Sequence, residues 1–365
     1  MSRTLSDAQR RDWLRLARTE NVGPVTFDQL ITRFGEPALA LAALPDLARR
    51  GGRAGVRVAG EAEADRELAA GAALGAQLIC SCEPAFPPAL AAVDPPPPLI
   101  WARGDAGLLD RPTVAIVGAR VASAAGQRFA RGLAAELGQA GLVVVSGMAR
   151  GIDAAAHEGS LPTGTVAVLG GGIDDVYPPE HRGLYERLCG SGCVVSENEP
   201  GRTAVARDFP RRNRIIAGLS RAVVVVEAEF RSGSLITARL AAEQGREVLA
   251  VPGSPLDPRA KGTNDLIRQG AAICEGAEDV LRALEGLRGF HEPERAPFQG
   301  PTAEPDDALR GRLSDLLSPT PVSRDELVRA AQAPAPAVFA ALMELALAGR
   351  AELMAGGMVV KGLAP

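Results

Sequence analysis

Short apolar runs alternate with amphipathic stretches through the central part of the chain. Six runs are rich in apolar, mainly β-branched residues and scarcely interrupted by polar ones: Thr113–Val117, Leu142–Ser146, Thr165–Leu169, Cys193–Ser196, Ala222–Glu227 and Glu247–Val251. Such runs are typical of strands that a sheet buries on both faces, and helical stretches separate most of them. The pattern therefore predicts right-handed βαβ units and a doubly wound, mostly parallel sheet over residues 108–288.

The two ends of the chain follow a helical pattern instead. Residues 1–107 predict a small helical domain, in which a Gly-Pro turn at Gly23 joins helices over Asp7–Arg18 and Thr26–Phe34. This turn resembles that of a helix-hairpin-helix, whose N–H groups bind phosphate, although an ordinary interhelical turn explains it as well. The four prolines at 95–98 predict a stiff connector to the next domain.

The C-terminal part is predicted to be a separate unit. Residues 289–306 are polar and rich in Pro, which indicates a linker, and residues 307–365 predict three helices followed by a hairpin. That order is typical of a winged helix. Its second and third helices carry few cations, so a role in protein contacts or in structure remains open beside DNA reading.

Composition limits the chemistry that this chain can perform. The net charge is −4 and nearly every cation is Arg, since Lys261 and Lys361 are the only lysines, so phosphate binding would need a local cluster of arginines. Five cysteines without a CxxC repeat and three histidines favour neither a disulfide framework nor a metal site. No apolar stretch has the length of a membrane span or a signal peptide, which predicts a cytoplasmic protein.

The loops after the first two strands carry residues suited to anion binding. Gly118, Arg120 and Ser123 follow the first strand, where they offer close backbone approach, a bidentate cation and a helix cap. The segment 146–151, with Ser146, follows the second and leads into a helix that carries an Asp153–His157 pair, consistent with acid–base work or a structural contact. Neither GxGxxG nor a Walker A sequence occurs, so no nucleotide cofactor is expected.

The segment 207–214 is the sharpest feature of the sequence. Four arginines, with Phe209 and Asn213 among them, precede an apolar helix, and cations beside an aromatic ring favour an unpaired nucleic acid strand. Ser232-Gly233-Ser234 then opens another helix after the fifth strand. Several loops of this kind at one sheet edge suit a ligand with repeated phosphates.

These motifs together resemble one family. The series VAIVGAR, SGMARGIDAAAH, YPPEHR, FPRRNRIIAGLS, VVVEA, RSGSLITA and GREVLAVPG is similar, in order, to the DprA/Smf family. The resemblance implies an extended Rossmann-like fold, with an N-terminal domain of the SAM or helix-hairpin-helix type. It also implies a homodimer that binds single-stranded DNA and loads RecA onto strands coated by SSB during natural transformation, without catalysis.

The loop chemistry and the resemblance predict one set of single-stranded DNA or phosphate contacts: Gly118, Arg120, Ser123, Ser146, Gly147, Arg150, Gly151, Phe209, Arg211, Arg212, Asn213, Arg214, Arg231, Ser232, Gly233 and Ser234. Phe209 either stacks on a base or lies in the core. Arg231 departs from the family, which often has Lys there and so a different hydrogen-bonding geometry.

Two other functions are compatible with parts of the sequence. Related Rossmann enzymes that cleave nucleoside monophosphates carry a PGGxGT loop, whereas the triple-glycine run at 170–172 lacks both the Pro and the Thr. That run serves tight packing or backbone approach to a ligand equally well. A structural adaptor acting through the C-terminal domain would leave the arginine segment unexplained.

Overall fold

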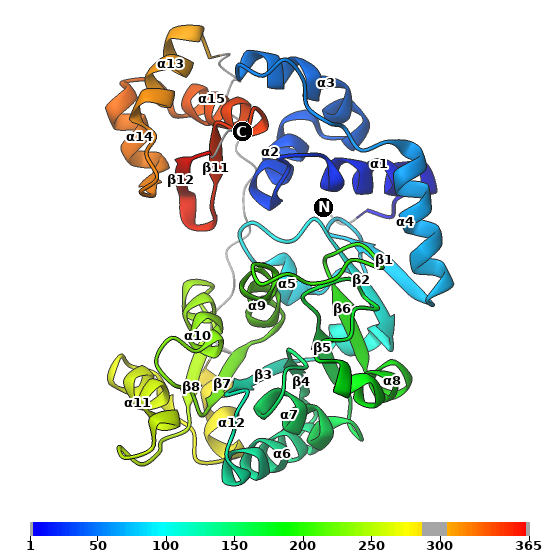
Figure 1. Cartoon of the computed structure of the whole chain (residues 1–365), viewed down its shortest axis with the longest axis vertical. Coiled ribbons are helices and arrows are strands. Elements are labelled where there is room, and N and C mark those ends of the chain that lie inside the picture. The colour runs from blue at the N-terminus through cyan, green and yellow to red at the C-terminus, as the bar shows by residue number, and fades with distance from the viewer. Residues whose placement is uncertain (1–2, 287–304, 363–365) are drawn as a thin grey trace.

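A computed structural model describes residues 3–286 and 305–362 of the chain, in three parts (Figure 1). A helical N-terminal domain and a C-terminal winged-helix domain lie side by side, and the sheet domain lies below both in that view. Most of the predicted linker at 289–306 is outside the described residues. Within them no single helix is long and apolar enough to cross a membrane, and one pair of helices, Arg324–Ala331 and Ala335–Leu347, has that length and composition only when taken together, with a bend of 111°.

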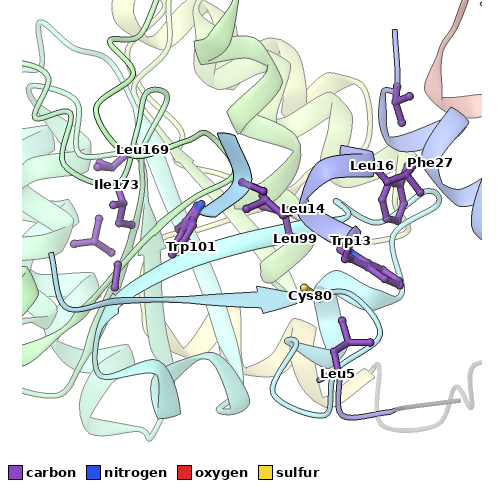
Figure 2. Packing of buried hydrophobic residues seen from close by; sticks show 14 of the residues in the cluster. Leu5, Trp13, Leu14, Leu16, Phe27, Cys80, Leu99, Trp101, Leu169 and Ile173 are labelled. Carbon is purple, nitrogen blue, oxygen red and sulfur yellow. The ribbon is translucent and has the colours of Figure 1, made fainter. Parts of the chain in front are cut away.

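Four helices form the N-terminal domain: α1 (Asp7–Arg18), α2 (Pro24–Phe34), α3 (Pro37–Arg50) and α4 (Glu61–Ala73). The rings of Trp13 and Phe27 pack 5.0 Å apart in its core, and Figure 2 shows this core running on toward Leu99 and Trp101. The indole N–H of Trp13 donates to the carbonyl oxygen of Pro98 at 2.8 Å. The proline-rich connector is thereby held against the N-terminal domain.

The central sheet has nine strands in the order β1-β2-β6-β5-β4-β3-β7-β8-β9. Their bounds are β1 Ala76–Cys80, β2 Leu99–Gly104, β3 Thr113–Gly118, β4 Val143–Ser146, β5 Thr165–Val168, β6 Cys193–Ser196, β7 Ala222–Val226, β8 Glu247–Ala250 and β9 Ala272–Ile273. Strands β3 to β9 pair in parallel, as the Val-rich runs predict. The order reverses between β3 and β7, which makes the carboxyl ends of these two strands the topological switch point.

Helices cover both faces of this sheet. The segments concerned are α5 (Pro88–Ala91), α6 (Ala124–Gln139), α7 (Ile152–Ser160), α8 (Arg182–Ser191), α9 (Asp208–Leu219), α10 (Gly233–Glu243), α11 (Lys261–Arg268) and α12 (Ala277–Gly286). Successive side chains of a strand point to opposite faces, so Val114 and Ile116 of β3 join the core under α6 and α7, while Ala115 and Val117 join the core under α9 and α10. The doubly wound prediction is confirmed.

The structure differs from the prediction at the start of this domain. Residues 76–104, expected to belong to a helical region with a connector, contribute β1 and β2 to the sheet. Both pair antiparallel, β1 with β2 and β2 with β6. β1 is the edge strand and its Gln77 is exposed, so its sequence lacks the continuous apolar run that marks the central strands. β2 has a buried apolar run at 99–102, but it directly follows the four prolines, which predict a connector.

The C-terminal part is a winged-helix domain. Its helices are α13 (Asp307–Leu316), α14 (Arg324–Ala331) and α15 (Ala335–Leu347), and its strands are β10 (Val322–Ser323), β11 (Ala351–Leu353) and β12 (Met358–Lys361), in the sheet order β10-β12-β11. The third helix, α15, packs on the N-terminal domain, because Met343 and Leu347 belong to the same apolar cluster as Leu41 and Leu44. The side-chain amide of Asn21 also donates to the carbonyl oxygen of Leu347 at 3.1 Å.

Candidate functional site

The predicted loops meet in one open groove at the switch point of the sheet. This switch-point groove has a volume of about 850 Å³ and is lined by the loop after β3, the loop after β7 and the first turns of α9 and α10. Seven of the lining residues carry its chemistry: Arg120, Phe209, Arg212, Asn213, Arg231, Ser232 and Ser234. Parallel sheets bind ligands at this place, where loops and helix N-termini converge.

Arg120 and Arg231 are exposed cations of the groove for which the described residues supply no hydrogen bond or ion pair, and Arg120 lies over an aromatic ring. The guanidinium carbon of Arg120 lies 5.4 Å above the centre of the Phe209 ring. Gly118, just before it, lies so close to β7 that a Cβ atom would collide with the carbonyl oxygen of Val226. Gly118 therefore lets the two strand ends meet, and Arg120 reaches over the groove from this junction.

Ser123 has a structural task in this arrangement. Its hydroxyl donates to Glu227 at 2.5 Å and accepts from the backbone N–H of Gly126 at 2.9 Å. The prediction that Ser123 caps the following helix is confirmed, since it is the N-cap of α6. With both bonds made, the hydroxyl is committed within the protein, and Ser123 does not line the groove.

The loop after β4 packs against the end of β3 and the loop that follows it. The Ser146 hydroxyl is fully buried and donates to the carbonyl oxygen of Ile116 at 2.6 Å, so it ties two strand ends together. Gly151 has a φ of +75°, and a Cβ atom there would collide with the carbonyl oxygen of Ala119. Arg150 is exposed and pairs with Glu180, and it lines a small pocket together with Arg120 and Phe209.

Arg212 is buried at the centre of the site. It is 7% exposed, and one Nη atom donates to the carbonyl oxygen of Gly147 at 2.7 Å and to that of Val168, while its Nε atom has no hydrogen-bond partner among the described residues. Burial lowers the pKa of Arg212 to about 10, against the opposing attraction of Asp153. The side chain stays cationic at neutral pH and braces the loop at 147.

Asp153 and His157 do not form an acid–base pair. Burial raises the pKa of the Asp153 carboxyl, which Arg212 and the N–H of Ala149 counteract. Burial also lowers the pKa of His157 to about 3, and its Nδ1 atom lies 2.8 Å from the Thr165 hydroxyl oxygen. No hydrogen bond joins Asp153 to His157 in the described part of the chain, so each is held by its own neighbours.

An aromatic platform lies beside Arg120. Phe209 is half-buried, and its ring centre is 5.4 Å from that of Tyr177, with the planes tilted by 52°. Tyr177 is 46% exposed and Phe230 is 58% exposed, and both line the groove. Sequence reasoning missed these two rings, although the YPPEHR motif contains Tyr177 and an aromatic beside Arg231 was visible as a signal.

Asn213 connects α9 to α10. Its side-chain amide donates to the carbonyl oxygen of Gly233 at 3.2 Å, which explains an asparagine among arginines at the start of an apolar helix. Ser232 is the N-cap of α10, and its hydroxyl oxygen lies 2.8 Å from that of Ser234. The N-terminus of α10 therefore presents two hydroxyls and the N–H group of Gly233 to the groove, as an anion site requires.

The remaining arginines of the segment face away from this groove. Arg211 and Arg214 line a separate cavity, and Arg214 donates to both carboxylate oxygens of Glu197 at 2.5 and 2.6 Å. The structure thus divides the predicted set between two surfaces of α9.

The triple-glycine run serves packing. The carbonyl oxygen of Gly171 accepts from Ser196 at 2.5 Å and that of Gly170 accepts from Asn198 at 2.6 Å. The N–H of Gly172 donates to the carbonyl oxygen of Arg202 at 2.7 Å. These groups are occupied within the protein, so the run does not offer them to a ligand.

Fold and site define a Rossmann-like protein with a phosphate-suited groove, flanked by helical and winged-helix domains. Three family models match in the same order: DprA-like N-terminal HHH domain over residues 7–70, DNA recombination-mediator protein A over 77–285 and DprA winged helix domain over 296–357. The chain therefore belongs to the DNA recombination-mediator protein A family, called DprA or Smf, and the resemblance inferred from the motifs is confirmed.

Individual relatives of the chain have the names of this family. Protein Smf of Escherichia coli is 40% identical over 282 residues, which cover 75% of this chain and 74% of that protein. DNA processing protein DprA of Bacillus subtilis is 40% identical over 222 residues, covering 60% of this chain and 75% of that protein.

Two solved structures are similar as well. DprA of Streptococcus pneumoniae has a TM-score of 0.63 at 32% identity and covers 77% of this chain and 98% of that one. DprA of Helicobacter pylori, whose structure is described in terms of its single-stranded DNA binding mode, has a TM-score of 0.53 at 30% identity and covers 59% of this chain and 97% of that one.

Proposed function

We propose that this protein is a non-catalytic recombination mediator that binds single-stranded DNA in the switch-point groove. The observation that carries the proposal is the exposed Arg120, which lies over the ring of Phe209 beside the N-terminus of α10. A phosphate can bind Arg120 and the N–H group of Gly233 while a neighbouring base meets the rings. The similarity to the Helicobacter pylori protein supports the same ligand.

Unpaired bases fit the groove better than a duplex does. Phe209, Tyr177 and Phe230 offer ring surface in the groove, and bases can stack on such surface only when they are not already paired and stacked in a helix. The charge of the whole chain is −4, so the attraction is local and strand binding should weaken as salt rises.

The predicted contacts divide into those that reach the ligand and those that shape the groove. We assign direct contacts to Arg120, Phe209, Arg231 and the Ser232–Ser234 turn, which line the groove. Ser123 and Ser146 hold the strand ends, because their hydroxyls are committed to Glu227 and Ile116. Arg212 shapes the groove, because one Nη atom donates to the carbonyl oxygens of Gly147 and Val168 and its Nε atom is buried.

The finer role follows from family membership. We propose that the protein shelters incoming single strands in natural transformation, acts as a homodimer in the cytoplasm and loads RecA onto strands coated by SSB. RecA filament growth on an SSB-coated strand, followed with and without this protein, tests the loading. An unchanged rate of growth would contradict it.

Binding itself is tested by titrating the protein against labelled oligo-dT, a duplex of the same length and AMP at several salt concentrations. The proposal predicts preference for the single strand and no release of free base from AMP, and base release would favour a nucleotide-cleaving enzyme. Arg120→Ala should flatten the slope of log K against log salt by roughly 0.7, the value for one phosphate contact. Arg268→Ala, at an exposed arginine of α11 outside the groove, is the matched control.

A further inference from the structure

A second charged cavity lies on the other side of α9. This interdomain cavity has a volume of about 960 Å³ and is lined by all three domains: the turn at 19–24 of the N-terminal domain, the face of α9 with segment 197–202, and strand β11 of the winged-helix domain. Figure 1 places α9 at the side of the sheet domain that faces α2 and β11. The cavity is thus formed only when the three domains are together.

Helical spacing makes α9 the wall between the groove and the cavity. Arg207, Arg211 and Arg214 follow one another at intervals of four and three residues, so they share one face of the helix, which lines the cavity. Phe209, Asn213 and Ile216 have the same spacing and line the switch-point groove. Arg212 lines both.

The interdomain cavity contains more positive than negative charge. Seven arginines and four carboxylates line it: Arg18, Arg53, Arg202, Arg207, Arg211, Arg212, Arg214, Glu20, Glu197, Asp208 and Glu352. Most of these arginines are committed to the protein. Arg202 bonds Asp208 at 3.0 Å, Arg53 bonds Glu20 at 3.1 Å, and Arg18 bonds Glu67 at 2.8 Å outside the lining.

Arg207 and Arg211 are the exceptions. Both are exposed, and neither has a hydrogen bond or ion pair with any described residue. The carboxylates of the cavity therefore leave these two cations uncompensated. The first turn of α2, capped by Gly23 without a side-chain hydrogen bond, adds positive potential to the opposite wall.

We propose that the interdomain cavity binds the backbone of the same DNA strand, a few nucleotides beyond the part held in the switch-point groove. This inference rests on the proposed function. Pro210 lines the groove and Arg211 lines the cavity, so a strand that passes the first turn of α9 leaves one and enters the other. A polyanion suits a cavity lined largely by charged groups, whereas small-molecule pockets are mostly apolar.

The test compares a short with a long oligo-dT on the full-length protein. A strand of about 6 nucleotides fits one groove and a strand of about 30 reaches well beyond it, since single binding folds occupy about 4–16 nucleotides. The double variant Arg207→Ala/Arg211→Ala should lower the salt slope of the long strand by about 1.4, which is two phosphate contacts, and that of the short strand by less. Equal changes for both lengths, or none for the long strand, would overturn the proposal.

Two further variants sharpen the comparison. Arg268→Ala/Arg282→Ala removes the same charge from exposed positions outside the cavity and should leave both slopes at the wild-type values. Glu352→Gln removes a carboxylate from the cavity wall and should tighten the long strand more than the short one. A Glu352→Gln protein that binds the long strand no better than wild type would count against phosphates near β11.

Different results of the same binding measurements would contradict the proposed function and the proposed role of the interdomain cavity. If the wild-type protein binds neither strand, or if Arg120→Ala leaves the short strand unaffected, the switch-point groove is not the primary site. If Arg120→Ala weakens both strands while Arg207→Ala/Arg211→Ala changes neither, the groove binds DNA and the interdomain cavity does not.

Discussion

Replacing Arg212 by Ala should destabilise the protein as well as weaken DNA binding. The guanidinium is buried, bonds the carbonyl oxygens of Gly147 and Val168, and faces Asp153. Losing charged hydrogen bonds worth roughly 1.5–3 kcal/mol each, and leaving a buried carboxylate without its cation, should lower the free energy of unfolding by about 3–5 kcal/mol. Urea unfolding followed by circular dichroism measures this difference.

The loss of unfolding free energy in Arg212→Ala should also depend on pH, because Arg212 lowers the pKa of Asp153 against the effect of burial. Without Arg212 the folded-state pKa of Asp153 rises further above its unfolded value. The folded state then binds the proton more tightly, so the added penalty is absent below the unfolded pKa, near 3.9, and grows as pH rises through the folded pKa. We expect Arg212→Ala to be closer to wild type at about pH 5 than at pH 7.

Arg211→Ala is the control within the same helix. Arg211 is exposed and has no partner among the described residues, so its removal should change the free energy of unfolding by no more than about 0.5 kcal/mol. The double variant Asp153→Asn/Arg212→Ala should recover part of the lost unfolding free energy. Its stability relative to wild type should no longer depend on the ionisation of residue 153. If Arg212→Ala unfolds within about 1 kcal/mol of wild type yet loses strand binding, Arg212 acts on the ligand and the bracing argument is wrong.

Three further predictions follow from the site and the domain contacts. Phe209→Ala should cost about 1–3 kcal/mol of single-strand affinity in fluorescence anisotropy, and Phe209→Leu should not restore it if the ring stacks on a base. Gly118→Ala should destabilise the sheet by about 1–3 kcal/mol, because β3 and β7 must separate to admit the methyl group; an unchanged melting temperature would contradict that packing. Glu344→Ala should cost about 3 kcal/mol in thermal unfolding, since buried Glu344 accepts from Arg310 at 2.7 Å, whereas Glu352→Ala should cost little.

The central strands could be predicted because strands buried on both faces have continuous apolar sequences. β7 has the sequence AVVVV and is buried along its whole length, so an apolar run marks it. β1 lies at the edge, where Gln77 meets solvent, and the prolines before β2 favour an extended connector instead. The place of both strands in the sheet depends on the pairing of β2 with β6, a contact between distant residues that no local pattern reveals.

The loops that form the site could be predicted from the sequence. The division of their residues between the switch-point groove and the interdomain cavity could not. The positions of Arg211 and Asn213 on different sides of α9 follow from helical periodicity, once the helix is known to begin at Asp208. The partners of Phe209 and Arg212 do not follow from it. Tyr177 reaches Phe209 from a segment without regular structure more than thirty residues earlier, and Arg212 finds its carbonyl oxygens on the loop after β4 and on β5.

The docking of α15 has a consequence for any protein that would recognise the winged-helix domain. In winged-helix proteins that read DNA the third helix enters the major groove, but here Met343 and Leu347 of that helix are covered by the N-terminal helices. Both domains belong to one chain, so their association does not pay the translational entropy of a bimolecular encounter. A protein that binds this face of α15 has to displace the N-terminal domain, which belongs to the same chain. Its binding would also separate the walls of the interdomain cavity.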